Sequence, residues 1–437
     1  MNPFAFSSDS IACGTADHWQ RRTFLKAAGL SGLGWLTPLA DALSVQSEKH
    51  PGKRPRSIIV LWLQGGASQL ETFDPHPDSA VSYGAKAIDT ALPGVKLGES
   101  LVQTAELLPK MSLVRSVVSA EGDHERAVYL GRTGYRIDPS IVHPALGAVV
   151  CHELPDTGLD IPAHVSILPS QWPAPKGGHL GAQYDAFQIG DPTKPIPDVK
   201  AQVDGERLAR RQGQLDLLEQ SFARGRAPDL DAKQTFHRDL MKQARRMMTS
   251  EQLAAFDVNQ ATAAERDAYG DSAFGRGCLA AARLIEVGVR CVEVTLNGWD
   301  THVNNHELQN SKAAVLDTAM AALIHDLEQR ELLDETIVVC ASEFGRTPKL
   351  NPVEGRDHWP HGFSFALAGG GFRQGYVHGA TDPTGEKEEP DSPVEVADLH
   401  ATIQHALGID FEYEVMTSAN RPIALSEGRV IQELLQG

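Results

Sequence analysis

Compositional bias, long apolar runs, paired cysteines and an excess of basic residues are all missing from this sequence of 437 residues. Hydrophobic residues make up 41% and charged residues 22%, which excludes disordered, collagen-like and disulfide-stapled proteins. No stretch beyond residue 42 reaches the roughly 18 apolar residues that a membrane span requires. The 40 basic and 57 acidic residues give a net charge of −17, which argues against duplex nucleic-acid binding. A small phosphate or sulfate ester stays compatible, because a local metal site can outweigh the global field.

The first 42 residues resemble a twin-arginine export signal. Arg21 and Arg22 precede Thr-Phe-Leu-Lys and the glycine-broken apolar run AAGLSGLGWLTPLA, and a small-x-small cleavage site ends at Ala42. The resemblance implies the twin-arginine export machinery as a partner and a periplasmic or secreted location. This segment carries equal numbers of basic and acidic residues, so its removal leaves the net charge at −17. The polar residues 43–56 are expected to form a linker.

The cysteines beyond this segment lie far apart and in apolar surroundings. They are Cys151, Cys278, Cys291 and Cys340, and none forms a C-x-x-C pair. We expect buried thiols that behave as small hydrophobic side chains. Folding in the reducing cytoplasm before export is consistent with free thiols.

Short apolar runs alternate with helical patterns along the rest of the chain. The runs, expected to be strands, lie at 57–63, 112–118, 163–168, 291–296, 336–341 and 364–369. Helices are expected at 141–154, 272–287, 307–330 and 396–409, and a solvated loop at 380–395. This alternation predicts an α/β domain with a mainly parallel sheet over 57–437. The charged residues 201–265 lack strand signal, and we interpret them as a helical insertion in that domain.

Polar residues follow the first apolar run, and sites in open α/β sheets lie beyond the carboxyl ends of strands. The run ends at Gln64-Gly65-Gly66, whose glycines permit close backbone approach or an anion-binding nest. Ser68 and Thr72 follow as candidate nucleophiles. An ordinary tight turn from strand to helix, with capping hydroxyls, explains the same residues equally well.

Two later strand ends carry candidate ligands. Asp300 and His302 follow the run at 291–296, and an extended Asp-x-His segment presents an oxygen and a nitrogen to one divalent ion. A helix-capping aspartate with surface histidines is the alternative. Glu343 follows the run at 336–341, where a buried carboxylate needs a metal or a cation. Arg346 offers that cation or, alternatively, bidentate binding of an anionic substrate.

The densest polar group of the sequence precedes the last apolar run. It contains Arg356, Asp357, His358 and His361 within six residues. We expect His358 or His361 to bind a metal, Asp357 to bind it or to orient a histidine, and Arg356 to hold an anion. A surface loop is the alternative. The pair Asp123-His124 suits a contribution on the substrate side, and the remaining histidines are assigned structural roles.

Several stretches in order along the chain resemble the bacterial "domain of unknown function 1501" family. They include LQGGASQLETFDP, HERAVYLGRTGY, HPALGAVV, CLAAARLIEVGVR, NGWDTH, LLDETIVVCASEFGRTP, GRDHW, LAGGG, GATD and DLHATI. The family is grouped by similarity with the alkaline phosphatase and sulfatase superfamily. The resemblance therefore implies a three-layer α/β/α sandwich around a mostly parallel sheet, with the helical insertion added to it.

The resemblance carries the superfamily's site over only in part. Gln64 stands where those enzymes place an aspartate, Phe344 where they place a histidine ligand, and His358 where they place a late histidine. One divalent ion rather than two is implied, with zinc, calcium or manganese as candidates. The residues left to bind it are Asp300, His302, Glu343 or Asp357, and His358.

Two functions are compatible with these residues. The first is an exported, metal-dependent hydrolase of phosphate or sulfate esters, acting on a small anionic ester or an anionic polysaccharide. In it Ser68, Thr72 or a metal-activated water attacks, while Arg346 and Arg356 hold the anion. The second is a non-catalytic binding protein built on the same scaffold.

Overall fold

The computed structural model describes most of the chain beyond the predicted leader. The described residues are 56–155, 158–169, 172, 174–197, 199, 203–223, 241 and 243–436. The predicted signal at 1–42 lies outside them, as do all but the last residue of the predicted linker at 43–56 and residues 224–240 of the predicted insertion. Among the described residues, no helix has the length and apolar character required to span a membrane.

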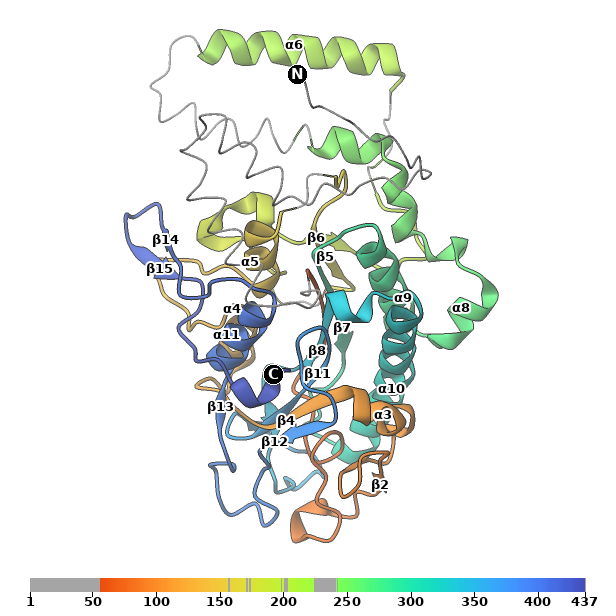
Figure 1. Ribbon diagram of the computed structural model, residues 1–437, viewed down its shortest axis with the longest axis vertical. Coiled ribbons are helices and arrows are strands. Elements are labelled where there is room, and N and C mark those ends of the chain that lie inside the picture. The colour runs from red at the N-terminus through yellow and green to blue at the C-terminus, as the bar shows by residue number, and fades with distance from the viewer. Residues whose placement is uncertain are drawn as a thin grey trace, which may run out of the picture. The chain divides into compact units, whose positions relative to one another are not determined.

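A nine-stranded, mostly parallel sheet forms the centre of the described chain (Figure 1). Its strand order is β12 (Tyr376–His378), β4 (Met111–Val118), β11 (Phe363–Gly369), β8 (Thr336–Ala341), β1 (Ser57–Gln64), β7 (Cys291–Asn297), β5 (His164–Ile167) and β6 (Phe187–Ile189), with β13 (Val394–Glu395) also paired to β4. Only β11 runs antiparallel to its described neighbours. All six predicted strands are present, so the predicted α/β fold with a mainly parallel sheet is confirmed.

Helices cover both faces of this sheet, because both faces are apolar. Ile59, Leu61 and Leu63 of β1 pack in one buried cluster with α3 (Val102–Leu107), α9 (Ala273–Glu286) and α10 (Asn305–Gln329). Ile58 and Trp62 pack in a second cluster with α4 (His124–Thr133), α5 (Leu146–Glu153) and α11 (Val396–Ala406). Figure 1 shows these two helical layers on opposite sides of the strands, which makes the three-layer sandwich that the family resemblance implies.

The helices predicted at 272–287 and 307–330 agree with α9 and α10 within two residues, whereas the helix predicted at 396–409 ends at Ala406 and the helix predicted at 141–154 begins late. The pattern at 141–154 predicts a helix from its first residue, whereas α5 begins only at Leu146. Pro144 explains the difference, because a proline disfavours the helical conformation in the residue before it. The prediction was therefore wrong for residues 141–145.

The described part of the predicted insertion contains helical structure. It comprises α6 (Gly205–Ala223), η6 (Glu251–Phe256), η7 (Val258–Gln260) and α8 (Ala263–Ala268). Short elements complete the domain: η2 (Ala80–Ser82), β2 (Ala87–Asp89), β3 (Lys96–Gly98), η3 (Leu108–Lys110), η4 (Gly178–Leu180), η5 (Ala182–Tyr184), η8 (Leu333–Glu335), β9 (Gly345–Arg346), β10 (His358–Trp359), β14 (Glu414–Met416), β15 (Pro422–Ala424) and η9 (Gln432–Leu434).

The four predicted buried thiols are confirmed as free and buried. Burial raises the pKa of each thiol, which keeps it in the neutral, unreactive form.

Strand direction brings distant segments to one edge of the sheet. β4, β8, β1 and β7 run the same way, so the residues that follow them meet at their carboxyl ends. β11 runs the opposite way, and therefore the segment that precedes it, which includes β10, reaches the same edge. The candidate residues follow or precede these five strands.

Candidate metal centre

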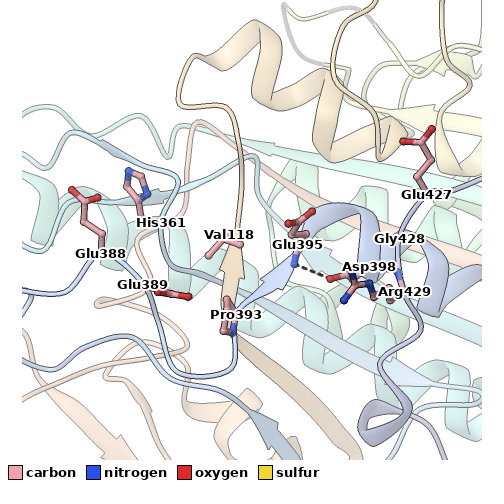
Figure 2. Close-up of a pocket in the computed structure, with 10 residues that line it drawn as sticks. All are labelled: Val118, His361, Glu388, Glu389, Pro393, Glu395, Asp398, Glu427, Gly428 and Arg429. Atoms are coloured by element: carbon pink, nitrogen blue, oxygen red, sulfur yellow. Dashed lines mark hydrogen bonds between the residues drawn. The ribbon is translucent and has the colours of Figure 1, made fainter.

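A surface hollow opens beyond the ends of β4 and β13, and it contains only one of the predicted ligands. Its volume is about 590 Å³, and Figure 2 shows acidic side chains around it. His361 lines this hollow with its ring edge-on to Trp359, the ring centroids lying 4.9 Å apart. The lining includes none of the other candidate ligands, and among the described residues His361 is not in the group whose ligand atoms could share one ion.

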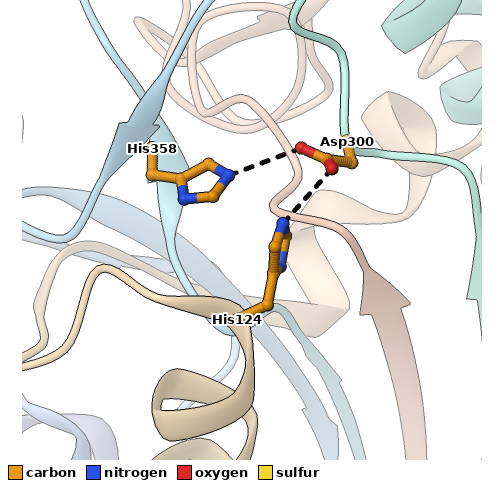
Figure 3. A group of neighbouring side chains, drawn as sticks. All are labelled: His124, Asp300 and His358. Atoms are coloured by element: carbon orange, nitrogen blue, oxygen red, sulfur yellow. Dashed lines mark ion pairs between the residues drawn. The ribbon is translucent and has the colours of Figure 1, made fainter. Parts of the chain in front are cut away.

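Three side chains from three segments meet at the sheet edge. They are His124 at the start of α4, Asp300 after β7 and His358 in β10 (Figure 3). His124 Nε2 lies 3.3 Å from Asp300 Oδ2, and His358 Nε2 lies 3.5 Å from Asp300 Oδ1. One ligand atom from each residue falls within 4.8 Å of the others, a spacing that allows one ion to bind all three. We call these residues the metal cluster.

Hydrogen bonds fix the tautomer of both cluster histidines. His124 Nδ1 lies 3.0 Å from Glu343 Oε1, and His358 Nδ1 lies 2.8 Å from the carbonyl oxygen of Gly122. A carboxylate and a carbonyl can only accept, so each Nδ1 carries the hydrogen in the neutral ring. Each Nε2 then directs a lone pair toward the cluster, as metal-binding histidines do.

The cluster contains a buried nitrogen with no hydrogen-bond partner. Within the described part of the chain, the buried His124 Nε2 makes no hydrogen bond, and the Asp300 carboxylate 3.3 Å away pairs with it only when the ring is protonated. An unpaired buried polar atom is costly unless something else satisfies it. A metal ion would satisfy His124 Nε2, and the donor set of two imidazoles and a carboxylate fits such an ion.

Electrostatics at the cluster favour a positive charge. Burial alone would lower the pKa of His124, but the carboxylates of Asp300 and Glu343 outweigh it and raise that pKa to about 9. Burial would raise the pKa of the Asp300 carboxyl, yet contacts with His124, His358 and Arg346 hold it well below its usual range. Asp300 is therefore ionised across the physiological range.

Glu343 holds the His124 ring of the cluster in position. Its Oε1 accepts hydrogen bonds from Gln64 Nε2 at 2.9 Å and from the backbone N–H of Gly65 at 2.8 Å, besides its contact with His124. Gln64 is itself fixed, because its Oε1 accepts from Trp62 Nε1 at 2.9 Å. Glu343, predicted as a ligand, thus contacts the cluster through His124, while its Oε2 is buried without a hydrogen-bond partner among the described residues.

The glycine turn after β1 provides close packing. Gly65 has φ +117°, and a Cβ there would lie 2.5 Å from the backbone nitrogen of Asp300. A Cβ on Gly66 would lie 2.6 Å from the ring of Phe344. The N–H groups of this turn point inward, since Gly65 donates to Glu343 and Ala67 donates to Ser342. The close approach expected from the glycines is present, while these donors are not free for an anion.

Phe344 forms an apolar floor under the two imidazoles. Its ring stacks on that of His358 with centroids 4.4 Å apart, and lies 4.9 Å from that of His124. The side chain is fully buried. Phe344 occupies space beside the cluster with carbon atoms that bind no metal.

Both predicted anion-binding arginines are buried and engaged. The three guanidinium nitrogens of Arg346 donate to the carbonyl oxygens of Gly65, Gly66 and Arg356, and one also contacts Asp300 Oδ1 at 2.6 Å. Arg356 pairs with Glu71 at 3.2 Å, and its other nitrogens donate to backbone carbonyls. Arg346 reaches the cluster as a support for Asp300, whereas Arg356 lies away from it.

Both predicted nucleophiles also face inward. Ser68 is fully buried, and its hydroxyl donates to Glu71. The hydroxyl of Thr72 donates to the carbonyl oxygen of Ser68 at 2.6 Å. Neither hydroxyl has a hydrogen bond to the cluster. The alternative of a turn into a helix with capping hydroxyls is wrong as well, because the next helical element after β1 is η2 at Ala80–Ser82 and both hydroxyls donate instead of accepting from backbone N–H groups.

The sequence signal for His124 was weak, because it was one Asp-His pair at the start of a helix. Its position next to a buried strand end was the available clue. His124 becomes a candidate ligand because β4, which precedes it in the chain, lies two strands from β8 in the sheet. The spacing of the motifs along the sequence does not reveal this strand order.

Known families and structures can be compared with this geometry. The family model described as "Protein of unknown function (DUF1501)" matches residues 55–435. No curated protein matches the sequence significantly.

Solved structures similar to the chain share little sequence with it. Ps i-CgsB in complex with k-i-k-neocarrahexaose is 10% identical over 82% of this chain and 73% of its own, with a TM-score of 0.41. The PsFucS1 sulfatase from Pseudoalteromonas sp. is 11% identical over 85% and 71%, with a TM-score of 0.38. A protein in the alkaline phosphatase superfamily from Vibrio parahaemolyticus is 11% identical over 88% and 71%, with a TM-score of 0.36.

Proposed function

The chain belongs to the DUF1501 family of proteins of unknown function, and from this premise we propose that it is an exported hydrolase of phosphate or sulfate esters that depends on one divalent ion. The observation that carries the proposal is the convergence of His124, Asp300 and His358, whose ligand atoms lie within reach of one ion. Three protein ligands leave an ion with an open position for a substrate, as in catalytic zinc sites.

The residues of the centre have separable tasks in this proposal. Asp300 and the two imidazoles hold the ion, Glu343 and the Gly122 carbonyl keep each Nε2 directed toward it, and Arg346 anchors Asp300. When bound, the ion would polarise the ester oxygen and stabilise the negative charge that develops during displacement.

A water molecule is the nucleophile we propose. Ser68 and Thr72 are buried and donate to internal acceptors, so an attack by either would require the segment to rearrange. Asp300 is 46% exposed and His358 24%, which leaves the open side of the cluster accessible to water and to an ester. The substrate class remains a small anionic ester or an anionic polysaccharide.

The test is metal-dependent turnover of aryl phosphates and aryl sulfates by the purified full chain. We expect activity that a chelator abolishes and that added zinc or manganese restores. His358→Ala is the inactive reference, and His325→Ala is the matched control because His325 is an exposed histidine on α10 outside the cluster. Turnover no higher than that of His358→Ala with every ester and metal would contradict the hydrolase.

A non-catalytic binding protein is the second candidate, and one observation favours it. Both predicted nucleophiles and both predicted anion-binding arginines are committed to internal contacts. Titration of a sulfated polysaccharide into the chain would support this candidate if binding saturates without release of sulfate. Release of sulfate during the titration would contradict it.

Export by the twin-arginine route is part of the proposal and rests on the sequence. Residues 1–42 act as the signal, 43–56 as the linker, and 57–437 as a single domain that carries the helical insertion at 201–265. Replacing Arg21 and Arg22 by lysines should retain the chain in the cytoplasm, while the unchanged chain reaches the periplasm or the medium. Equal export of both forms, measured by cell fractionation, would contradict this route.

A further inference from the structure

One face of helix α6 is exposed and combines apolar, charged and small residues. Its members recur every three or four residues and therefore lie on one side of the helix: Glu206, Ala209, Arg210, Gly213, Asp216 and Leu217. All six are exposed, and Leu217 is 68% exposed. The half-buried residues Leu208, Gln212 and Leu215 lie on the other side of the helix. We call the six exposed residues the α6 face.

Gly213 lies at the centre of the α6 face. Glycine is unfavourable inside a helix, because it leaves the unfolded chain more conformational freedom than other residues do. A Cβ built at Gly213 would meet no atom within 4 Å in the described part of the chain, so packing within the chain does not require a glycine here. The missing side chain does permit the backbone of a second helix to approach closely.

The α6 face is complementary to itself when two helices cross antiparallel at Gly213. A two-fold axis relates the helices of such a pair, and residues equally far from the centre on either side meet across it. Leu217, four residues after Gly213, then packs on Ala209 of the second copy, four residues before it. Arg210 meets Asp216 of the second copy, since each lies three residues from the centre. Symmetry provides each of these contacts twice.

Charge selects both the partner and its direction. Asp216 has no basic residue one turn earlier in its own helix, because Gln212 and Gly213 stand there. In an antiparallel pair each Asp216 faces an arginine. A parallel pair would instead place Arg210 beside Arg210 and Asp216 beside Asp216, and such like charges repel. The face therefore fits a second copy of this helix in the antiparallel direction.

We propose that α6 joins two copies of this chain in an antiparallel pair centred on Gly213. The proposal is independent of the metal cluster and of ester hydrolysis. One pair of helices of this length buries less area than the about 1,200–2,000 Å² that stable interfaces bury, so the dimer should dissociate on dilution.

Sedimentation velocity of the purified full chain over a concentration series tests the proposal. We expect a monomer–dimer equilibrium that shifts toward the monomer on dilution and at high salt, which screens the charge pairs. Leu217→Glu should weaken the dimer roughly tenfold or more, because the apolar contact is lost at two symmetric positions. Leu218→Glu is the matched control, since Leu218 is also exposed, at 57%, but lies about 100° further round the helix.

A charge exchange tests the direction of the pair. Asp216→Arg should weaken the dimer roughly tenfold, because two arginines then meet at both symmetric positions, and Arg210→Asp should do the same with two carboxylates. The double variant Arg210→Asp/Asp216→Arg should restore the dimer. Arg211→Asp makes the same charge change at an exposed position on the far side of the helix and should leave the dimer unchanged.

Gly213→Leu separates the dimer from the fold. Leucine favours the helix, so this variant should unfold in urea no earlier than the unchanged chain, while its side chain at the two-fold axis should drive the helices apart. A chain that is monomeric at every concentration would overturn the proposal. A dimer that persists in Leu217→Glu and Gly213→Leu, or a double variant no better than Asp216→Arg, would overturn it as well.

Discussion

Arg346→Lys tests whether this guanidinium is a structural clamp or a free anion site. Arg346 is fully buried, and its three nitrogens serve three backbone carbonyls and Asp300. A lysine has one nitrogen on a flexible stem, so it cannot reach acceptors that are spread around a planar fork. At least part of this set, which includes the carbonyl oxygens of Gly65 and Arg356, would stay buried without a donor.

The expected cost follows from those acceptors. A buried acceptor without a partner costs about 1–3 kcal/mol, so two of them reduce stability by about 2–6 kcal/mol. Native proteins have only about 5–15 kcal/mol of stability, and the urea midpoint of Arg346→Lys should therefore fall markedly with little change in the slope. Arg136→Lys is the matched control, because the Arg136 side chain is 68% exposed and we expect it to unfold like the unchanged chain.

The opposite result is expected if the Arg346 guanidinium binds an anion. If the Arg346 guanidinium were free to hold a substrate, Arg346→Lys would unfold at the wild-type urea concentration. Inorganic phosphate or sulfate would then raise the midpoint of the unchanged chain and not that of the variant. That pair of results would refute the clamp.

Three further predictions concern the turn after β1, the hydrogen bonds between Asp74 and Thr381, and the buried His400. Gly65→Ala should destabilise the chain in urea and weaken zinc binding, because its Cβ would meet the Asp300 backbone at 2.5 Å; unchanged unfolding would contradict this. Asp74→Asn should lower the urea midpoint, since Asp74 Oδ2 accepts from the N–H of Thr381 at 2.8 Å and from its hydroxyl at 2.7 Å. Asp78→Asn, at an exposed position four residues on, should cost less. Burial lowers the pKa of His400 to about 4, so the unfolded chain binds a proton between pH 4 and 6.5 that the folded chain does not, and stability rises with pH across that window. His400→Gln should remove about 2 kcal/mol of this rise between pH 4.5 and 7, measured by urea unfolding at both values. An equal pH dependence in both forms would contradict the burial argument.

The strands and most helices could be predicted because each depends on local apolar patterns. The runs at 57–63 and 336–341 are apolar throughout, and they pair as neighbours at the centre of the sheet. The antiparallel direction of β11 could not be predicted, since its apolar residues are the same for either direction. Because β11 runs antiparallel to β8, the segment before β11, which carries His358, lies at the same edge of the sheet as Asp300, which follows β7.

Roles within the site were harder to predict than membership of it. Asp300, His302 and His358 lie close together, as expected. Glu343 and Asp357 instead contact the Nδ1 atoms of His124 and His302, respectively. A carboxylate that binds an ion and one that orients an imidazole look the same in a sequence. Ser68 is different, because its partner Glu71 lies three residues away and local contacts of that kind are visible from spacing.

The formal charge of the centre decides how it could hold an anionic ester. Asp300, Glu343 and Asp357 supply three formal negative charges at the centre, and Arg346 supplies one positive charge. A divalent ion would just balance these four charges. An ester would then be attracted by the ion and by no free arginine of the cluster, so removal of the metal should abolish ester binding as well as turnover. If the metal-free chain binds a sulfated polysaccharide as tightly as the metal-loaded chain does, the binding surface lies elsewhere and the centre is not the substrate site.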